Sequence, residues 1–174
     1  RRVYARDTIF KETNEDLASF FDSNHMQGKA RSNRRFVLED RDTGQTLGAV
    51  SFGSHHRISD VMTLNRLAFK SGVQIVGGVS KLMKNSLKQI SEDVVTWSDN
   101  RYSTGEIYER HGFRFDGDLR PDYCYFDTNE RRLRSKQSCK KSAICCPKHI
   151  TERQFLWDAG VYRLWDCGKR RFVR

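Results

Sequence analysis

A pair of glycines stands where a predicted strand gives way to a predicted helix. Residues 62–70 have the composition of a strand, and the helix after Gly77 and Gly78 places its apolar residues along one face. Glycines at a helix start let backbone N–H groups approach a ligand, and that end of a helix carries partial positive charge. The turn therefore predicts a cradle for a phosphate group.

Three side chains are candidates for acid–base chemistry. Tyr108 follows a short buried strand on a predicted helix, and its phenol is the candidate general acid. His25, in a polar loop, is the first candidate base or metal ligand, and Asp99, just past the strand that ends at Trp97, is the second. Each has a structural alternative: Tyr108 as a core aromatic, His25 and Asp99 as hydrogen-bonding groups of loops.

The elements that must position these groups alternate as β, α, β, β, β, α, β, α, β, β over residues 3–126. Asn14 is a predicted helix cap, and Ser103 and Glu106 have capping-box spacing before a second short helix. The turn at residues 42–45 predicts a hairpin between strands 35–40 and 46–52. The first strand is expected over residues 3–10, and residues 127–150 are expected to be irregular. This order predicts an α/β fold.

Positive charge is concentrated near the end of the chain, whose formal net charge is +10. Residues 1–128 hold 19 basic and 18 acidic side chains, whereas residues 129–174 hold 13 and 4. We therefore expect a domain over 1–128 and a basic C-terminal arm over 129–174. The arm should hold a strand and a short helix, which Thr151 and Gln154 open with capping-box spacing. Aromatic residues interleave the charges of the arm, which favours nucleic acid as its partner over a merely solubilising role. The predicted nucleic-acid-binding residues are Arg131, Arg132, Arg134, Lys136, Lys140, Lys141, Lys169, Arg170 and Arg171.

The five cysteines are odd in number and include no Cys-x-x-Cys pair, which favours a reducing cytoplasm. Cys139, Cys145, Cys146 and His149 invite a zinc interpretation, but their spacing fits no common structural site. We expect no structural metal and leave a catalytic metal open. No apolar run approaches the roughly 18 residues of a membrane span, and no signal peptide is visible within these residues.

Two motifs together resemble the GNAT superfamily of N-acetyltransferases: Gln74-x-x-Gly77-x-Val79, and the run Ile107-Tyr108-Glu109-Arg110-His111-Gly112-Phe113. The resemblance covers roughly residues 3–126 and implies a mixed, mostly antiparallel central sheet flanked by helices. It also implies acetyl-CoA or another acyl-CoA as cofactor, with the pyrophosphate at the glycine turn. Val79 departs from the family, which prefers glycine or alanine there. The implied cofactor-binding residues are Leu67, Phe69, Gln74, Val76, Gly77, Gly78, Val79, Ser80 and Lys81.

A narrower set of segments resembles bacteriophage acyltransferase-like proteins, which are related to Mom-type DNA adenine-modification proteins and found alone or joined to homing endonucleases. The segments are Asn24-His25-x-x-Gly28, Ser51-Phe52-Gly53, Arg66-Leu67, residues 76–82 and residues 162–168. This resemblance implies a DNA base amino group as acceptor, an anti-restriction role and the cytoplasm of an infected host. Two alternatives stay open: a catalytically inactive DNA-binding module of a homing endonuclease, and an N-acetyltransferase acting on aminoacyl-tRNA.

Overall fold

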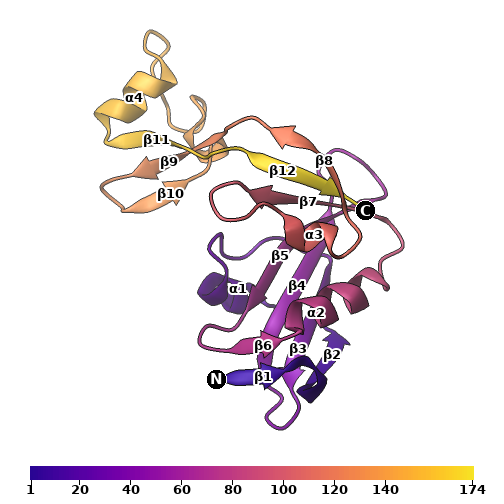
Figure 1. Ribbon diagram of the computed structural model, residues 1–174. Helices are drawn as coiled ribbons and strands as arrows, with labels where there is room; N and C mark the ends of the chain where they lie inside the picture. Colours follow the sequence, from indigo (N-terminus) through magenta and orange to yellow (C-terminus); the bar gives the residue numbers. More distant parts are fainter. The chain divides into compact units, whose positions relative to one another are not determined.

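The computed structural model describes residues 1–174 and divides into two compact units (Figure 1). The first comprises residues 1–97, 105–116 and 171–174, and the second comprises residues 98–104 and 117–170. This division differs from the expected boundary at residue 128. It differs because the basic end of the chain is a strand, β12 (Lys169–Val173), whose last residues belong to the first unit.

A seven-stranded sheet organises the first unit, in the order β2-β3-β4-β5-β7-β12-β8. The pairs β2/β3, β3/β4 and β4/β5 are antiparallel, whereas β5 and β7 are parallel. Besides β12, its strands are β2 (Thr8–Glu12), β3 (Arg34–Asp40), β4 (Thr46–Ser54), β5 (Val61–Phe69), β7 (Asp93–Asp99) and β8 (Arg114–Leu119).

Apolar residues point to both faces of this sheet, so both faces are covered. On β3, Phe36 and Leu38 join a large cluster that includes Leu82 and Met83 of α2 (Gly78–Leu87). Val37, between them, points the other way and joins a cluster with residues of α1 (Ala18–Asn24). Because successive side chains of a strand alternate between faces, α1 and α2 cover opposite faces (Figure 1). The hairpin between β3 and β4 and the amphipathic helix after the glycine pair are confirmed.

The first predicted strand is wrong in one respect. Residues 3–10 divide into β1 (Arg2–Tyr4), a 3-10 turn η1 (Ala5–Asp7) and the start of β2. β1 leaves the main sheet and pairs in parallel with β6 (Gln74–Val76), which directly precedes the glycine pair. The turn at Ala5 to Asp7 changes the chain's direction, so one apolar run supplies strands to two sheets.

The short helix predicted to begin at Ser103 begins two residues later, with Gly105 at its N-cap position. The short helix α3 (Glu106–Glu109) begins after Gly105, which has a φ of 85° and makes no side-chain cap. A Cβ at Gly105 would lie 2.2 Å from the ring of Phe172, so the ring packs against the bare backbone. Tertiary packing has therefore decided the start of this helix.

The second unit is built on a three-stranded antiparallel sheet in the order β10-β9-β11. Its strands are β9 (Tyr123–Asp127), β10 (Arg132–Arg134) and β11 (Val161–Trp165), and its helical elements are η2 (Gln137–Cys139) and α4 (Glu152–Asp158). The predicted cap of α4 is confirmed, because the Thr151 hydroxyl accepts the Gln154 amide at 3.1 Å. A cluster of Tyr125, Cys139, Leu156 and Val161 forms the core of this unit.

The expected α/β class, with a mixed, mostly antiparallel sheet flanked by helices, is confirmed. No helix of the chain has both the length and the apolar character needed to cross a lipid bilayer.

Candidate active site

The two parallel strands at the centre of the sheet stay paired for only part of their length. Their register joins Val61 with Asp93, Met62 with Val94 and Thr63 with Val95, and no further pair follows. A register shift between β4 and β5 inserts Asn65 as an extra residue just beyond this point. A bulge bends a strand and increases its twist, so β5 turns away from β7. From Leu64 onward, the β7-facing edge of β5 has no strand partner.

Tyr108 lies where the two strands separate. The Thr96 hydroxyl is hydrogen-bonded to the Tyr108 oxygen as a donor, the sense that lowers a phenol's pKa, and it also reaches the carbonyl oxygen of Leu64, 3.2 Å away. Burial raises the pKa of Tyr108 above its usual value, and the hydrogen bond with Thr96 acts in the opposite direction. The ring packs against Phe113 and Phe172 at centroid distances of 5.7 and 5.4 Å. The phenol is therefore held in place and stays protonated at neutral pH.

The glycine turn presents an open helix N-terminus. Gly77 has a φ of 75°, caps α2 without any side-chain hydrogen bond, and is exposed, as is Ser80. The first N–H groups of a helix have no intrahelical acceptor. The amides at the start of α2 can therefore receive an anion, which the helix dipole favours.

Three of the predicted cofactor-binding side chains or amides have other roles nearby. The Gln74 amide donates to the Arg1 carbonyl in the β1/β6 pairing. The Lys81 ammonium donates to the carbonyl oxygens of Ala5 and Thr8, the first at 2.8 Å. The side chain of Val79 packs against the main core, so its branch does not lie over the turn. The anion cradle is thus made of backbone amides from Gly77 onward, without an ammonium group.

The remaining predicted cofactor residues lie on the two strands that lead to the cradle. Leu67 and Phe69 are on the part of β5 that is paired with β4 but not with β7, and both pack partly against the main core. Val76 ends β6, one residue before Gly77. Alternate N–H groups on the free edge of β5 point toward the space left by β7, where a carbonyl oxygen could accept them.

His25 ends α1, and its geometry does not suit a general base. Its Nδ1 accepts the Gln27 amide at 3.1 Å, and burial, with the nearby charge of Arg66, lowers the pKa of His25. A neutral imidazole that accepts at Nδ1 carries its proton on Nε2, so no lone pair is left for a substrate. Arg66 donates to the carbonyls of Gln27 and Gly28, so it fixes this loop instead of binding phosphate or a carboxylate.

Asp99 belongs to the second unit, whereas Tyr108 and His25 belong to the first. Its carboxylate forms a two-pronged ion pair with Arg101, with a shortest distance of 2.7 Å. The hydrogen bonds from Arg101 lower the pKa of Asp99. A carboxylate paired in this way is a weak base, so Asp99 does not suit the role of general base.

Most of the predicted nucleic-acid-binding cations are paired with acids. Arg132, Arg134, Lys136, Lys169, Arg170 and Arg171 form salt bridges with carboxylates. Arg131 and Lys140 do not, and the Lys141 ammonium donates to the backbone carbonyls of Lys148 and Ile150. The second unit keeps a surplus, with 13 basic and 8 acidic side chains.

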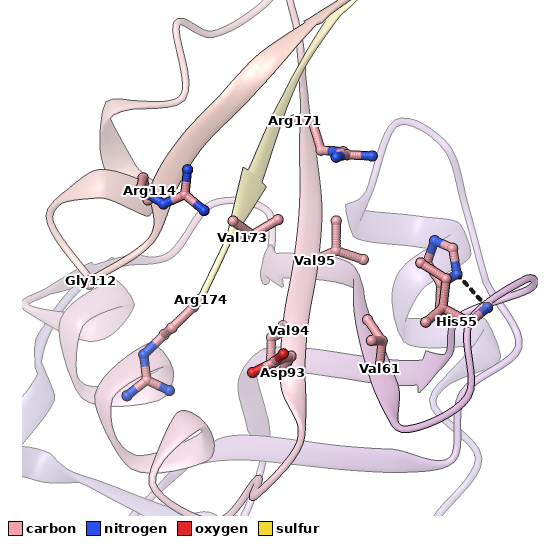
Figure 2. A pocket seen from close by; sticks show the side chains of 11 residues that line it. His55, Val61, Asp93, Val94, Val95, Gly112, Arg114, Arg171, Val173 and Arg174 are labelled. Atoms are coloured by element: carbon pink, nitrogen blue, oxygen red, sulfur yellow. Dashed lines mark hydrogen bonds between the residues drawn. The ribbon is translucent and has the colours of Figure 1, made fainter.

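A pocket that the sequence did not indicate opens on the first unit (Figure 2). Its volume is about 470 Å³, and valines 61, 95 and 173 contribute to its lining, with arginines 114, 171 and 174 around them. It lies at the paired ends of β5 and β7, so it is distinct from the point where they separate. Its cations come from two segments far apart in the sequence, the start of β8 and the C-terminal end of the chain, so no local motif could reveal them.

No group of three or more His, Cys, Asp or Glu side chains in the chain is arranged to hold a metal ion. Cys139 is buried in the core of the second unit, and Cys145 is exposed.

This topology defines the class of fold. Solved structures with the same fold are GNAT-type acetyltransferases, and the sequence itself matches no protein-family model and no curated protein.

Three of these structures show the extent of the likeness. The spermidine/spermine N-acetyltransferase SpeG from Vibrio cholerae aligns with a TM-score of 0.55 at 13% identity, over 98% of this chain and 93% of that one. The ribosomal-protein-S18-alanine N-acetyltransferase from Escherichia coli aligns with a TM-score of 0.54 at 11% identity, over 95% of this chain and 92% of that one. A GNAT family acetyltransferase from Elizabethkingia anophelis with acetyl-CoA bound aligns with a TM-score of 0.52 at 10% identity, over 96% of this chain and 97% of that one. At these identities the likeness establishes the fold.

Proposed function

We propose that this protein is an acyl-CoA-dependent N-acyltransferase whose acceptor is an amino group of nucleic acid. The observation that carries the proposal is the separation of β5 from β7 beside an uncapped helix N-terminus, with the phenol of Tyr108 at the point of separation. A similarly folded enzyme has acetyl-CoA bound. The exposed turn at Gly77, free of any side-chain cap, fits a pyrophosphate.

The chain's own residues supply three functions for acyl transfer. Backbone amides at the start of α2 bind the diphosphate and fix the direction of the cofactor. N–H groups on the free edge of β5 stabilise the oxyanion that forms when an amine attacks the thioester. The raised pKa of Tyr108 keeps the phenol protonated at neutral pH. The phenol gives this proton to the departing sulfur, so that coenzyme A leaves as a thiol, and water returns a proton to the phenolate.

A base that removes the proton of the attacking amine is not evident among His25 and Asp99, because both are engaged locally. Water is the acceptor for that proton in our proposal. The amino group of an adenine is conjugated with its ring and nucleophilically weak, so positioning must supply most of the acceleration.

The acceptor is proposed from charge. The second unit carries the surplus of basic side chains, and arginine and lysine next to aromatic rings suit phosphates and bases together. We propose DNA, with a base amino group as the target, as the phage-protein resemblance implies, and an infected bacterial host as the setting. Transfer to aminoacyl-tRNA is less favoured.

Mass spectrometry of nucleosides from the DNA of cells that express the protein tests this proposal. We expect a new base adduct with the mass of an acyl group, absent from cells that express Tyr108→Phe. Purified protein should also gain thermal stability with acetyl-CoA, because a ligand that binds the native state raises the melting temperature. No adduct and no thermal shift at millimolar acetyl-CoA would refute it.

A second candidate is a DNA-binding module that keeps the fold without catalysis. The use of the Gln74 amide by β1 and of the Lys81 ammonium by Ala5 and Thr8 favours it, since both reduce the grip on a diphosphate. DNA binding without any acetyl-CoA response would support this second function.

A further inference from the structure

The second unit contains a small cavity between α4 and β11. Its volume is about 170 Å³, and Arg153 and Trp157 line it from the helix. These two are four residues apart, so they share one side of α4. Arg163 and Trp165 line it from β11, where alternate residues share one face of the sheet. Tyr125 of β9, which is fully buried, forms the floor.

Aromatic rings stand exposed at the mouth of this cavity. Trp157 is 55% exposed and Trp165 is 56% exposed, which is unusual for side chains of this size and apolarity. Neither ring is loose. Trp157 packs edge-to-face with Tyr162 at 4.7 Å, and Trp165 lies 4.9 Å from Tyr123. The two rings are thus fixed in advance of any ligand, which lowers the entropic cost of binding one.

Two arginines that form no salt bridge line the cavity, and the carboxylate of Glu152 reaches Arg163 only through the shared Tyr125 hydroxyl. Neither Arg153 nor Arg163 is within salt-bridge distance of a carboxylate, in contrast to the paired Arg134 and Lys136. The Arg163 guanidinium lies 4.4 Å from the ring centre of Tyr123 and donates to the Tyr125 hydroxyl at 3.4 Å. Its position is therefore fixed, and its remaining N–H groups are available to an anion.

The floor is also fixed by a hydrogen-bond chain. The Tyr125 hydroxyl donates to a carboxylate oxygen of Glu152 at 2.6 Å, and the other oxygen of Glu152 accepts the Lys141 amide at 3.1 Å. These bonds satisfy the polar atoms beneath the cavity. A ligand is therefore held by ring faces and by the two arginines, not by the floor.

The size of the cavity limits what enters it. A cavity of about 150 Å³ holds a benzene molecule, so this one accepts a single six-membered ring but not a whole purine. Aromatic faces that flank a ring-sized space, with arginines beside it, suit a base and its phosphates. We propose that the cavity binds single-stranded nucleic acid by taking one pyrimidine between Trp157 and Trp165, with Arg153 and Arg163 on the adjoining phosphates.

This inference deepens the proposed function by specifying how a nucleic acid is held, but it does not depend on acyl transfer. The cavity shares no residue with the turn at Gly77 or with Tyr108. Fluorescence anisotropy measures oligonucleotide binding alone. A catalytically inactive protein could therefore still bind at this cavity, and an active enzyme could lack binding there.

Fluorescence anisotropy with labelled ten-nucleotide strands tests the inference on the full chain. We expect oligo-dT and oligo-rU to bind more tightly than oligo-dA, with any dT or rU preference identifying the nucleic acid. Trp157→Leu and Trp165→Leu should each weaken oligo-dT binding by roughly 5- to 150-fold, the loss expected for one stacked base. Arg153→Gln should weaken it and reduce its salt dependence.

Leu164→Ala is the matched control, because this residue is 46% exposed on the same strand but points to the other face of the sheet. It should leave oligo-dT affinity unchanged. Unfolding midpoints of the tryptophan variants should match that of the wild type, since both rings are more than half exposed. Equal affinity for dT and dA, unchanged affinity in both tryptophan variants, or preferential binding of a proline-rich peptide would overturn the proposal.

Discussion

Replacing Tyr108 by phenylalanine separates catalysis from packing at the candidate active site. The ring contacts with Phe113 and Phe172 remain, so the core loses no volume. What disappears is one hydroxyl and its hydrogen bond with Thr96. The structural cost is therefore that of a single buried hydrogen bond, about 1 kcal/mol, or a fall in melting temperature of about 2–4 °C for a chain of this size.

The catalytic cost is expected to be far larger. A positioned acid contributes roughly 10²- to 10⁴-fold to the rate of a reaction, or about 3–5 kcal/mol of transition-state stabilisation. Because the phenol acts on the leaving sulfur, the loss should fall on kcat and leave KM for acetyl-CoA nearly unchanged. Thiol release from acetyl-CoA, with duplex DNA as acceptor, measures both constants.

Thr96→Val is the control for this experiment. It removes the hydrogen bond to the phenol but leaves the phenol itself, so its effect on kcat should be well below that of Tyr108→Phe. If Tyr108→Phe keeps kcat within about threefold of the wild type while its melting temperature falls as expected, the phenol is only a core group and the assignment is refuted.

Three further predictions address the cradle, acid stability and alkaline titration. Gly72→Ala and Gly77→Ala replace glycines that share a φ of 75°, so each should destabilise the fold by about 1–2 kcal/mol through backbone strain. Only Gly77→Ala should raise the Kd for coenzyme A in calorimetry. Burial favours the protonated form of Asp166, but hydrogen bonds from Lys169 and two backbone amides outweigh it and lower the pKa of Asp166 to about 2. Asp166→Asn should therefore lower the free energy of unfolding by about 2 kcal/mol near pH 7. In denaturant titrations this difference from the wild type should vanish as the pH falls from about 4 to 2. Burial, with the hydrogen bond to Glu152, raises the pKa of Tyr125 to about 12. Tyr125→Phe should therefore remove the tyrosine ionisation that occurs at the highest pH in an absorbance titration. A variant that keeps this ionisation would disprove the assignment.

The sequence predicted those elements whose signals are local. The glycine pair of the turn at Gly77 and the apolar face of the following helix are both recognisable in a short stretch of sequence, and α2 forms where expected. The same holds for Thr151, whose hydroxyl caps α4. Ser103 has the same spacing, but the helix begins after Gly105, where the ring of Phe172 packs against the backbone. A contact between residues so distant in sequence leaves no local pattern.

The pairing of strands was beyond sequence reasoning for a similar reason. β1 pairs with β6 across more than seventy residues, and this pairing uses the backbone amide of Gln74, a residue that the resemblance had assigned to the cofactor. His25 was a fair candidate from its type alone. Its engagement by the Gln27 amide depends on how the loop folds, which its type does not encode.

The last strand also changes how the basic region must be tested. β12 lies between β7 and β8, and Val94 exchanges two backbone hydrogen bonds with Arg174, both 2.9 Å long. Phe172 is 1% exposed within the main core. The basic region is therefore not a terminal arm, since most of it is a long insertion between two neighbouring strands of one sheet.

Deleting residues 129–174 would remove a buried phenylalanine, and loss of such a side chain alone costs about 3–5 kcal/mol. Lost DNA binding in that truncation would then report unfolding, not a missing contact.

Charge substitutions within the insertion avoid this problem. Arg131→Gln with Lys140→Gln removes two cations that form no salt bridge, and it should reduce the salt dependence of duplex binding by about two counterions. Arg132→Gln, whose side chain is already paired with Glu130, should change it less. Equal effects would show that the pairing does not screen these charges from DNA.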